Sequence, residues 1–370
     1  MSTAEILIAI AKVLLVFTVG LGTVVLLVWG ERKVVADLQN RVGPDRAGPW
    51  GILQTVADGL KLFFKEQIDP DRADKVVFNL APFLAAVPAL LLVLVIPLAR
   101  PVEITLDGAP FTLNFAALDL NVGVLFALAM SSIAVYAIVL AGWSSGSKYP
   151  LLGGVRGSAQ AISYEAAMGL AMVAVVMWVS TLPAVTDMGA MSVNEIVLRQ
   201  QGTFFPNNAF LSWIPSWNLV PQFPAFAIFM IAIFAETNRA PFDLVEAEQE
   251  IVAGFHTEYS GMRFAMFFLA EYLNMFTMSA LAVSLFLGGW GGPFLDALDG
   301  WAAAGLSFVY FMVKVGLVLF LFVWVRATFP RFRYDQLMQL GWKRLIPTAL
   351  VWLILTTLVV SFREFGAPWA

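Results

Sequence analysis

The sequence predicts an all-α polytopic membrane protein with about eight transmembrane helices and amphipathic surface helices in its loops. Hydrophobic residues make up 60% of the 370 positions and charged residues only 13%. The hydrophobic residues also gather in long uninterrupted runs, which is typical of membrane spans. This composition leaves too little polar surface for a water-soluble protein of this length. We therefore expect one membrane domain covering residues 1–370.

Eight hydrophobic segments are long enough, or nearly long enough, to cross about 30 Å of hydrocarbon at about 1.5 Å per residue. The expected spans are residues 6–29, 76–99, 122–143, 161–182, 219–236, 264–287, 304–325 and 345–362. The first run is longer than the hydrophobic part of a signal peptide, so we expect a retained span. An even number of spans places both termini on the same side of the membrane.

Basic residues in the connections predict the orientation. The odd-numbered connections hold most of the Lys and Arg residues, whereas the opposite side holds only Arg100, Arg199 and Arg363. Lys and Arg accumulate in cytoplasmic loops. The odd-numbered connections are therefore expected in the cytoplasm and both termini outside it.

The composition excludes several kinds of site. The chain has no Cys, so it cannot hold a disulfide, a Cys-ligated iron–sulfur cluster or a Cys-based zinc site. It contains no G-x-G-x-x-G after a strand, no Walker A motif and no H-E-x-x-H. His256 is the only histidine and cannot build a haem or metal site alone. We expect no metal site and no catalytic residue in this chain, and any redox metal on a partner.

The first cytoplasmic connection, residues 30–75, is too long to be a plain linker. Gly-Pro pairs at 43–44 and 48–49 predict turns that stop helix formation. After Pro49, apolar residues follow helical spacing and polar residues share the opposite face, which predicts an amphipathic helix along the membrane surface. A simple lipid anchor is one interpretation. It does not explain the rigid Gly/Pro connection.

The third cytoplasmic connection, residues 236–263, is acidic. Its acids are Glu236, Asp243, Glu246, Glu248, Glu250 and Glu258, against Arg239 and His256. If residues 243–250 form a helix, Glu246 and Glu250 repel each other by about 0.2–0.5 kcal/mol. A solvated acidic face is one interpretation. The interspersed apolar residues instead favour partial burial, which would raise carboxylate pKa values and allow proton exchange near neutral pH.

Ionisable residues also enter the expected spans, where an isolated charge costs at least ~2.5–3.5 kcal/mol. These residues are Glu165, Glu236, Glu271 and Lys314, with Lys314 roughly 18 Å from the cytoplasmic boundary. Snorkelling of Glu165 and Glu236, or a static Glu271–Lys314 ion pair, would be structural explanations. A file of carboxylates leading toward Lys314 instead suggests a proton relay.

Long motifs run from the first expected span to the last. They are residues 31–33 (ERK), 39–49 (QNRVGPDRAGP), 57–61 (ADGLK), 65–66 (KE), 162–165 (ISYE), 235–244 (AETNRAPFDL), 258–260 (EYS), 270–272 (AEY) and 326–338 (RATFPRFRYDQLM). The chain closely resembles the H-subunit family of proton-pumping NADH-quinone oxidoreductase, or complex I. It departs from that family's usual Asn at Asp45 and at His256.

The resemblance implies a function inside a larger enzyme. Such subunits dock a peripheral arm that carries flavin (FMN) and iron–sulfur clusters, line the chamber where quinone is reduced, and start a proton route toward antiporter-like membrane subunits. The implied partners are those subunits, quinone and lipid, and not nucleic acid. The implied location is a bacterial inner membrane with periplasmic termini and large cytoplasmic loops that form the chamber and docking surface.

By the same resemblance, two groups of residues carry the function. The quinone chamber or its mouth would be shaped by Arg32, Arg41, Arg46, Asp58, Lys61, Phe242 and Asp243. The proton path would use Glu165, Glu236, Glu246, Glu248, Glu250, Glu258, Glu271 and Lys314. Quinone reduction consumes two protons, so nearby carboxylates can change protonation with the headgroup.

Two other functions stay open at this stage. Related subunits serve membrane-bound hydrogenase-type complexes, although the first-loop motif favours the quinone enzyme. The chain could alternatively be a stand-alone proton-coupled transporter. The long ordered loops and the lack of an internal repeat argue against that function.

Overall fold

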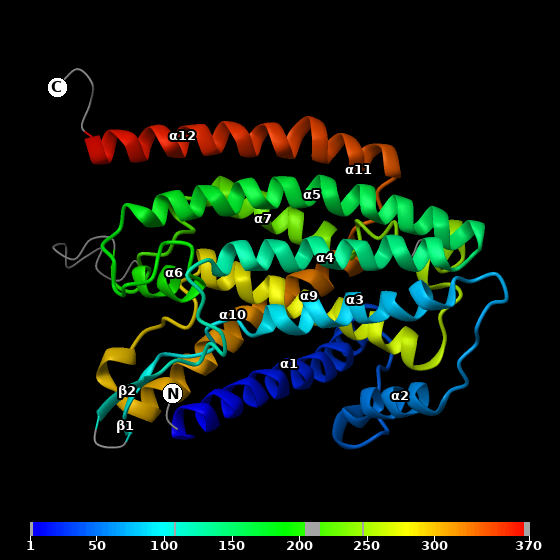
Figure 1. The fold of residues 1–370 in the computed structure, drawn as a ribbon, viewed down its shortest axis with the longest axis horizontal. Helices are drawn as coiled ribbons and strands as arrows, with labels where there is room; N and C mark the ends of the chain where they lie inside the picture. The colour runs from blue at the N-terminus through cyan, green and yellow to red at the C-terminus, as the bar shows by residue number, and fades with distance from the viewer. Residues whose placement is uncertain (1–2, 107–108, 204–214, 246–247, 366–370) are drawn as a thin grey trace.

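The computed structural model describes residues 3–106, 109–203, 215–245 and 248–365 (Figure 1). The helices are α1 Thr3–Leu38, α2 Leu53–Phe64, α3 Lys75–Val93, α4 Gly123–Ser144, α5 Lys148–Ser180, α6 Val193–Arg199, α7 Phe223–Glu236, α8 Glu248–Ile251, α9 Gly261–Phe286, α10 Gly300–Thr328, α11 Tyr334–Leu340 and α12 Ile346–Phe365. Short 3-10 turns are η1 Pro49–Gly51, η2 Gly254–His256 and η3 Leu295–Ala297, and a π-helical turn, η4 Gly341–Leu345, joins α11 to α12.

The long helices form one bundle and confirm the expected all-α polytopic membrane fold. Within the described ranges, seven helices are long and apolar enough to cross a bilayer, with α11 and α12 counting as one. The expected fifth span corresponds to α7, which has 14 residues and is therefore only about 21 Å long. Pro224 lies in its first turn, where proline is well tolerated, so the helix starts there rather than further upstream.

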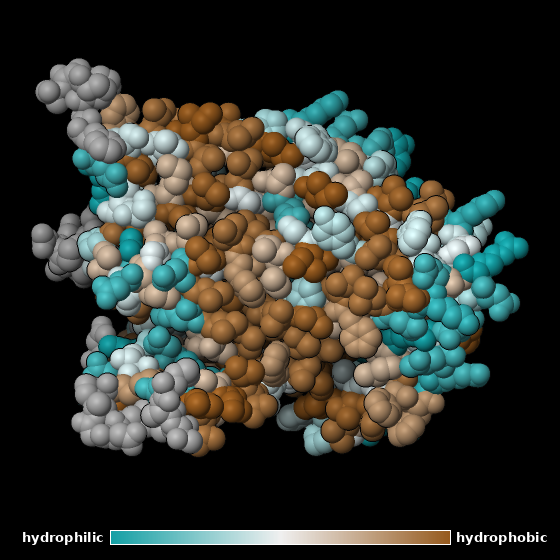
Figure 2. All heavy atoms as spheres, viewed as in Figure 1, coloured by the Kyte–Doolittle hydropathy of each residue, from teal (hydrophilic) through white to brown (hydrophobic). Residues whose placement is uncertain are grey.

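The two ends of the bundle differ. The start of α1 and the end of α12 lie together at one end, the far end, as an even number of crossings requires (Figure 1). Helix α2 lies at the opposite end, here called the loop end. A hydrophobic band crosses the middle of the molecule, with hydrophilic residues gathered at the loop end and in smaller patches at the far end (Figure 2). This surface is what a bilayer would cover.

Helix α9 is the central helix of the bundle. Over a hydrophobic stretch of 18 residues in α9, 72% of the residues are buried, compared with 33% over the corresponding stretches of α1 and α10. Elsewhere in the bundle, small residues let α4 and α5 pack closely: a Cβ on Gly142 of α4 would lie 2.4 Å from the Pro150 carbonyl oxygen of α5. Because α9 is surrounded by protein, Glu271 within it is held away from lipid.

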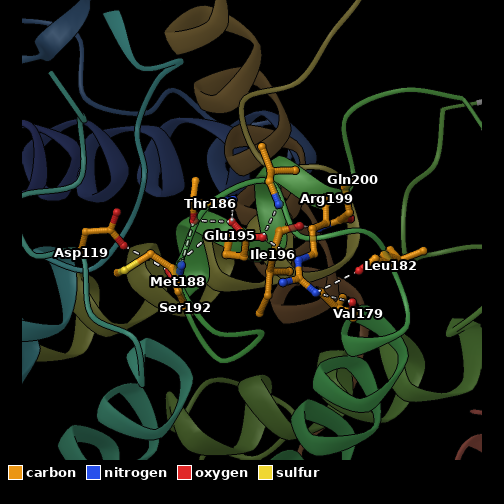
Figure 3. Close-up of polar contacts among 11 residues, drawn as sticks. Asp119, Val179, Leu182, Thr186, Met188, Ser192, Glu195, Ile196, Arg199 and Gln200 are labelled. Carbon is orange, nitrogen blue, oxygen red and sulfur yellow. Dashed lines mark hydrogen bonds and ion pairs between the residues drawn. The ribbon is translucent and has the colours of Figure 1, made fainter. Parts of the chain in front are cut away.

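At the far end, a polar cluster fixes the loop that follows α5 (Figure 3). Arg199 donates to Glu195 at 2.7 Å and to the carbonyl oxygen of Val179 at 2.9 Å. Thr186 donates its hydroxyl to Glu195 at 2.6 Å. Burial alone would raise the pKa of Glu195, but these hydrogen bonds and the Arg199 charge lower it below its ordinary value. The cluster ties α6 to the end of α5.

The far end of α9 is fixed by side chains from other segments. Lys314 of α10 donates to the carbonyl oxygens of Leu287, Gly289 and Gly291 at 2.7, 3.0 and 2.6 Å. Glu271 lies 16 residues before Leu287, about 24 Å away along a helix. The static Glu271–Lys314 ion pair, considered above as an alternative to a proton relay, is therefore wrong, because Lys314 contacts the far end of α9 and Glu271 lies near its loop end.

Three features of the fold were not expected from the sequence. Strands β1 Val102–Leu106 and β2 Ala109–Leu113 form an antiparallel hairpin in which Val102 pairs with Leu113. Helix α6 lies in the next far-end connection. Residues 243–245 are not helical, and α8 begins at Glu248. The helix considered over 243–250 is thus wrong.

Candidate functional site

Four segments meet at the loop end and form a charge cluster, here called the buried charge cluster. Glu31, Arg239 and Glu271 lie inside it, and Arg326, whose side chain is 46% exposed, lies at its edge. Arg239, just after α7, lies with Nε 2.9 Å from Oε1 of Glu271 and with Nη1 3.5 Å from Oε1 of Glu31. Arg326, near the end of α10, also pairs with Glu31. Two arginines thus balance two carboxylates that reach the cluster from α1 and α9.

Tyr272 completes the surroundings of the buried charge cluster. Its hydroxyl donates to Oε2 of Glu31 at 2.7 Å, and its ring lies 4.3 Å from the guanidinium carbon of Arg239. Burial alone would lower the pKa of Arg239, but Glu271 and Glu31 raise it above its ordinary value. Arg239 therefore stays cationic although it is only 7% exposed.

Phe242 and Asp243 lie beside this cluster and contact the segment after α10. Phe242 is buried between the rings of Tyr164 and Phe332, with ring centres 5.3 and 5.4 Å away. Asp243 accepts from Nη2 of Arg331 at 2.9 Å. Burial raises the pKa of Asp243, while the nearby Arg331 opposes that shift. The carboxyl is thus poised to take up a proton more easily than a solvent-exposed aspartate.

Next to the buried charge cluster lies a cavity of about 70 Å³, here called the acidic cavity. Its polar lining residues are Glu236, Thr237, Asn238, His256, Glu271 and Asn274. Oε2 of Glu236 is buried and has no hydrogen-bond partner among the described residues. Because Glu271 also belongs to the buried charge cluster, its carboxylate contacts both the cluster and the acidic cavity.

Glu165 of α5 lies near Glu236 but does not line the acidic cavity. Its Oε1 accepts from Ser131 at 3.1 Å and also from Ser132 of α4. Glu165 lies close enough to Glu236 to act on it electrostatically. The structure thus places Glu165 near Glu236, and Glu236 and Glu271 line the same cavity. All three belong to the predicted proton path.

The predicted amphipathic helix of the first loop is α2, and it is held against α1 by charge. Asp58 accepts from Arg32 at 2.6 Å and lies 3.9 Å from Nζ of Lys61. Burial alone would raise the pKa of Asp58, but hydrogen bonds from Arg32 and Gln54 lower it below its ordinary value. Arg41 and Arg46, which precede α2, are exposed at the same end of the bundle.

The remaining acids of the third loop are more dispersed. Glu250 pairs with Arg156 of α5 at 2.7 Å and is half exposed. Glu258 is partly buried two residues after His256. Glu246 lies outside the described residues, and the side chain of Glu248, at the start of α8, is likewise not described. Within the described part of the chain, no group of three or more His, Asp or Glu residues could hold a metal ion.

Comparisons with known proteins decide the family. The family model described as NADH dehydrogenase matches residues 11–357. The chain is 48% identical over 362 residues to the NADH-quinone oxidoreductase H subunit 1 of Geobacter sulfurreducens, covering 96% of this chain and 95% of that protein. It is 47% identical over 359 residues to the protein of the same name from Geobacter metallireducens, covering 97% and 98%. The chain belongs to the H-subunit family of NADH-quinone oxidoreductase.

In this member of the H-subunit family, the sequence motifs contain site residues that were not predicted to line the quinone chamber or the proton path. Glu31, Tyr272, Arg326 and Arg331 were recognised only as parts of motifs. Arg331 pairs with the selected Asp243. Glu31 and Tyr272 contact Arg239, which pairs with the selected Glu271, and Arg326 pairs with Glu31. One signal could have identified Glu31: it closes a long apolar run, so its carboxylate needs a buried partner. Its two arginine partners lie 208 and 295 residues away in sequence, and only the fold brings them together.

Proposed function

We propose that the chain is the membrane subunit of an H⁺-translocating NADH:quinone oxidoreductase, forming the membrane side of the quinone chamber and coupling quinone reduction to proton movement. The observation that carries this proposal is the double placement of Glu271. It pairs with Arg239 in the buried charge cluster and lines the acidic cavity with Glu236. A charge change near the loops can therefore act on a carboxylate that also faces the interior of the bundle.

The quinone chamber would lie at the loop end, between this chain and the peripheral arm. Arg32, Asp58 and Lys61 would shape its mouth where α2 meets α1, with Arg41 and Arg46 exposed nearby. Phe242 and Asp243 would lie deeper, behind the segment that holds Arg331. These residues would bind and orient the headgroup, and the electrons would come from the iron–sulfur clusters and FMN of partner subunits.

Coupling would follow from charge balance. Reduction of a quinone to a quinol adds two electrons and two protons, and each electron that arrives before its proton leaves negative charge in the chamber. That negative charge would attract Arg239 and Arg326 and weaken their ion pairs with Glu31 and Glu271. Glu271 would then bind a proton more readily. The proton would continue through Glu236 and Glu165.

The proposed orientation follows the basic residues. The loop end, which carries most Lys and Arg, would face the cytoplasm of a bacterial cell and dock the peripheral arm. Both termini would face the periplasm. Antiporter-like membrane subunits would receive the proton signal from the α4–α5 side, where Glu165 lies.

The test is purification of the tagged chain from its native membranes in mild detergent, with mass spectrometry of its companions and an assay of NADH oxidation with added quinone. Co-purified flavin and iron–sulfur subunits, with inhibitor-sensitive quinone reduction, would support the proposal. A nickel hydrogenase subunit among the companions would instead favour the hydrogenase-type complex. A chain that purifies alone and moves solute in vesicles would overturn the proposal.

A further inference from the structure

His256 lines the acidic cavity but has no role in the function proposed above. It ends the η2 turn, where its ring packs edge-on against Phe255 and Phe264, with ring centres 5.0 and 5.3 Å away. The side chain is neither fully buried nor fully exposed. It therefore stands between the loop-end surface and the cavity that holds Glu236 and Glu271.

The acidic cavity is suited to hold water. A volume of about 70 Å³ is room for several molecules, since one water needs roughly 10–15 Å³ by this measure. Asn238 and Asn274 supply polar groups in its wall. Oε2 of Glu236 is buried and finds no partner among the described side chains and backbone, and such a carboxylate oxygen is costly unless water reaches it. Water in the cavity would connect its polar groups by hydrogen bonds.

We propose that His256 relays protons between the loop-end surface and the cavity water beside Glu236, a role that rests on the proposed function. One ring nitrogen binds a proton arriving from the surface, and the other nitrogen releases its proton to cavity water. The N–H bond formed at one nitrogen balances the N–H bond broken at the other. The proton ends on the carboxylate of Glu236 or Glu271. The imidazole is then neutral but in its other tautomer, and a ring flip returns it to the starting arrangement.

The charged residues around His256 favour a relay in which the imidazole is neutral before and after each proton transfer. Glu236 faces it from α7 and Glu271 from α9, the latter already paired with Arg239. On the α5 side Arg156 is paired with Glu250, and the residues that α3 and α4 contribute to the cavity wall are apolar. Burial lowers the pKa of His256 to about 4, so the ring is neutral at physiological pH. A neutral imidazole can accept and donate a proton at once, which an imidazolium cannot.

The decisive experiment uses the whole purified complex in proteoliposomes, with NADH and a short-tail quinone analogue as substrates. His256→Gln keeps a polar side chain of similar reach but cannot exchange protons, and His256→Ala leaves space for added imidazole. Phe264→Leu is the matched control, because it removes a ring contact of His256 and keeps the imidazole. Electron transfer from NADH to an acceptor upstream of quinone measures assembly in every variant.

We expect His256→Gln to lower quinone-linked proton uptake by about tenfold or more, the scale of losing a positioned proton-transfer group. Added imidazole should restore much of the proton-uptake rate in His256→Ala. The proton-uptake rate of Phe264→Leu should stay close to that of the parent. Equal rates and equal pH profiles in His256→Gln and the parent would overturn the relay. So would equal losses in His256→Gln and Phe264→Leu without imidazole rescue. A parent complex that reduces quinone without any proton uptake would overturn the proposed function itself.

Discussion

Arg239 and Glu271 form an ion pair with Nε and Oε1 2.9 Å apart, although one belongs to a loop and the other to the central helix. The same guanidinium also faces Glu31, and both acids are largely removed from solvent. One side chain therefore contacts carboxylates on two transmembrane helices. Its removal would leave both acids dependent on Arg326, which contacts only Glu31 directly.

Arg239→Ala should sharply reduce the amount of assembled complex. Removing one partner of a buried ion pair typically costs about 3–5 kcal/mol, because an uncompensated charge remains in the interior. Thermal unfolding of the purified complex and the yield of subunits on a native gel measure the loss. Arg333→Ala is the control, since Arg333 is 75% exposed and pairs only with its neighbour Asp335. Similar stability in both variants would contradict the structural role of the cluster.

Glu236→Gln and Glu271→Gln should assemble normally and lose quinone-linked proton transfer. Glutamine keeps the shape and hydrogen-bonding reach of glutamate but cannot carry a proton, and both residues line the acidic cavity. Proton uptake by proteoliposomes during NADH oxidation measures the effect. Glu103→Gln provides the comparison, because Glu103 lies in strand β1, is exposed and is outside the predicted proton path. Full pumping by either cavity variant would count strongly against the relay.

The sequence was sufficient to predict the bundle because hydrophobic runs depend only on local composition. All eight expected spans correspond to helices, and the amphipathic segment after Pro49 is α2. The length of α7 and the β1–β2 hairpin were not foreseen. A proline near a helix start and a short hairpin between spans leave weaker patterns in the sequence than runs of about 20 apolar residues.

The site was only partly predictable, because its key contacts join residues far apart in the chain. Glu31 meets Arg326 across 295 residues, and no pattern of spacing could reveal that contact. Lys314 shows the same limit. Its depth in an apolar run suggested a relay, but its three bonds to carbonyl oxygens fix the end of α9. The depth of a residue in the membrane can be predicted from the sequence, whereas the residues that its side chain contacts cannot.

Acidification should loosen α2 from α1 by protonating Asp58. The pKa of Asp58 is lowered in the folded state, so its contribution to stability is present above its ordinary value of 3.8 and is lost as the pH falls through the lower folded value. The pair with Arg32 is partly exposed and contributes about 0.2–1 kcal/mol. Limited proteolysis of the first loop between about pH 5 and pH 3 measures the change.

Asp58→Asn supplies the control for that experiment. The variant should show faster cleavage of the first loop at neutral pH and little further change on acidification, because it has no carboxylate to protonate. Cleavage that accelerates equally with acid in the parent and in Asp58→Asn would assign the effect to another group.

Lys314→Met should destabilise the chain without changing the number of protons moved per electron. Lys314 satisfies the carbonyl oxygens of Leu287, Gly289 and Gly291 and lies 4.5 Å from the ring of Trp217. Leaving such acceptors unsatisfied costs about 1–3 kcal/mol each where water cannot replace the donor. Thermal unfolding of the complex measures this loss, and Lys314→Arg, which keeps a charged donor, should retain more stability. If Lys314→Met assembled with unchanged stability and lost pumping, the lysine would belong to the proton path after all.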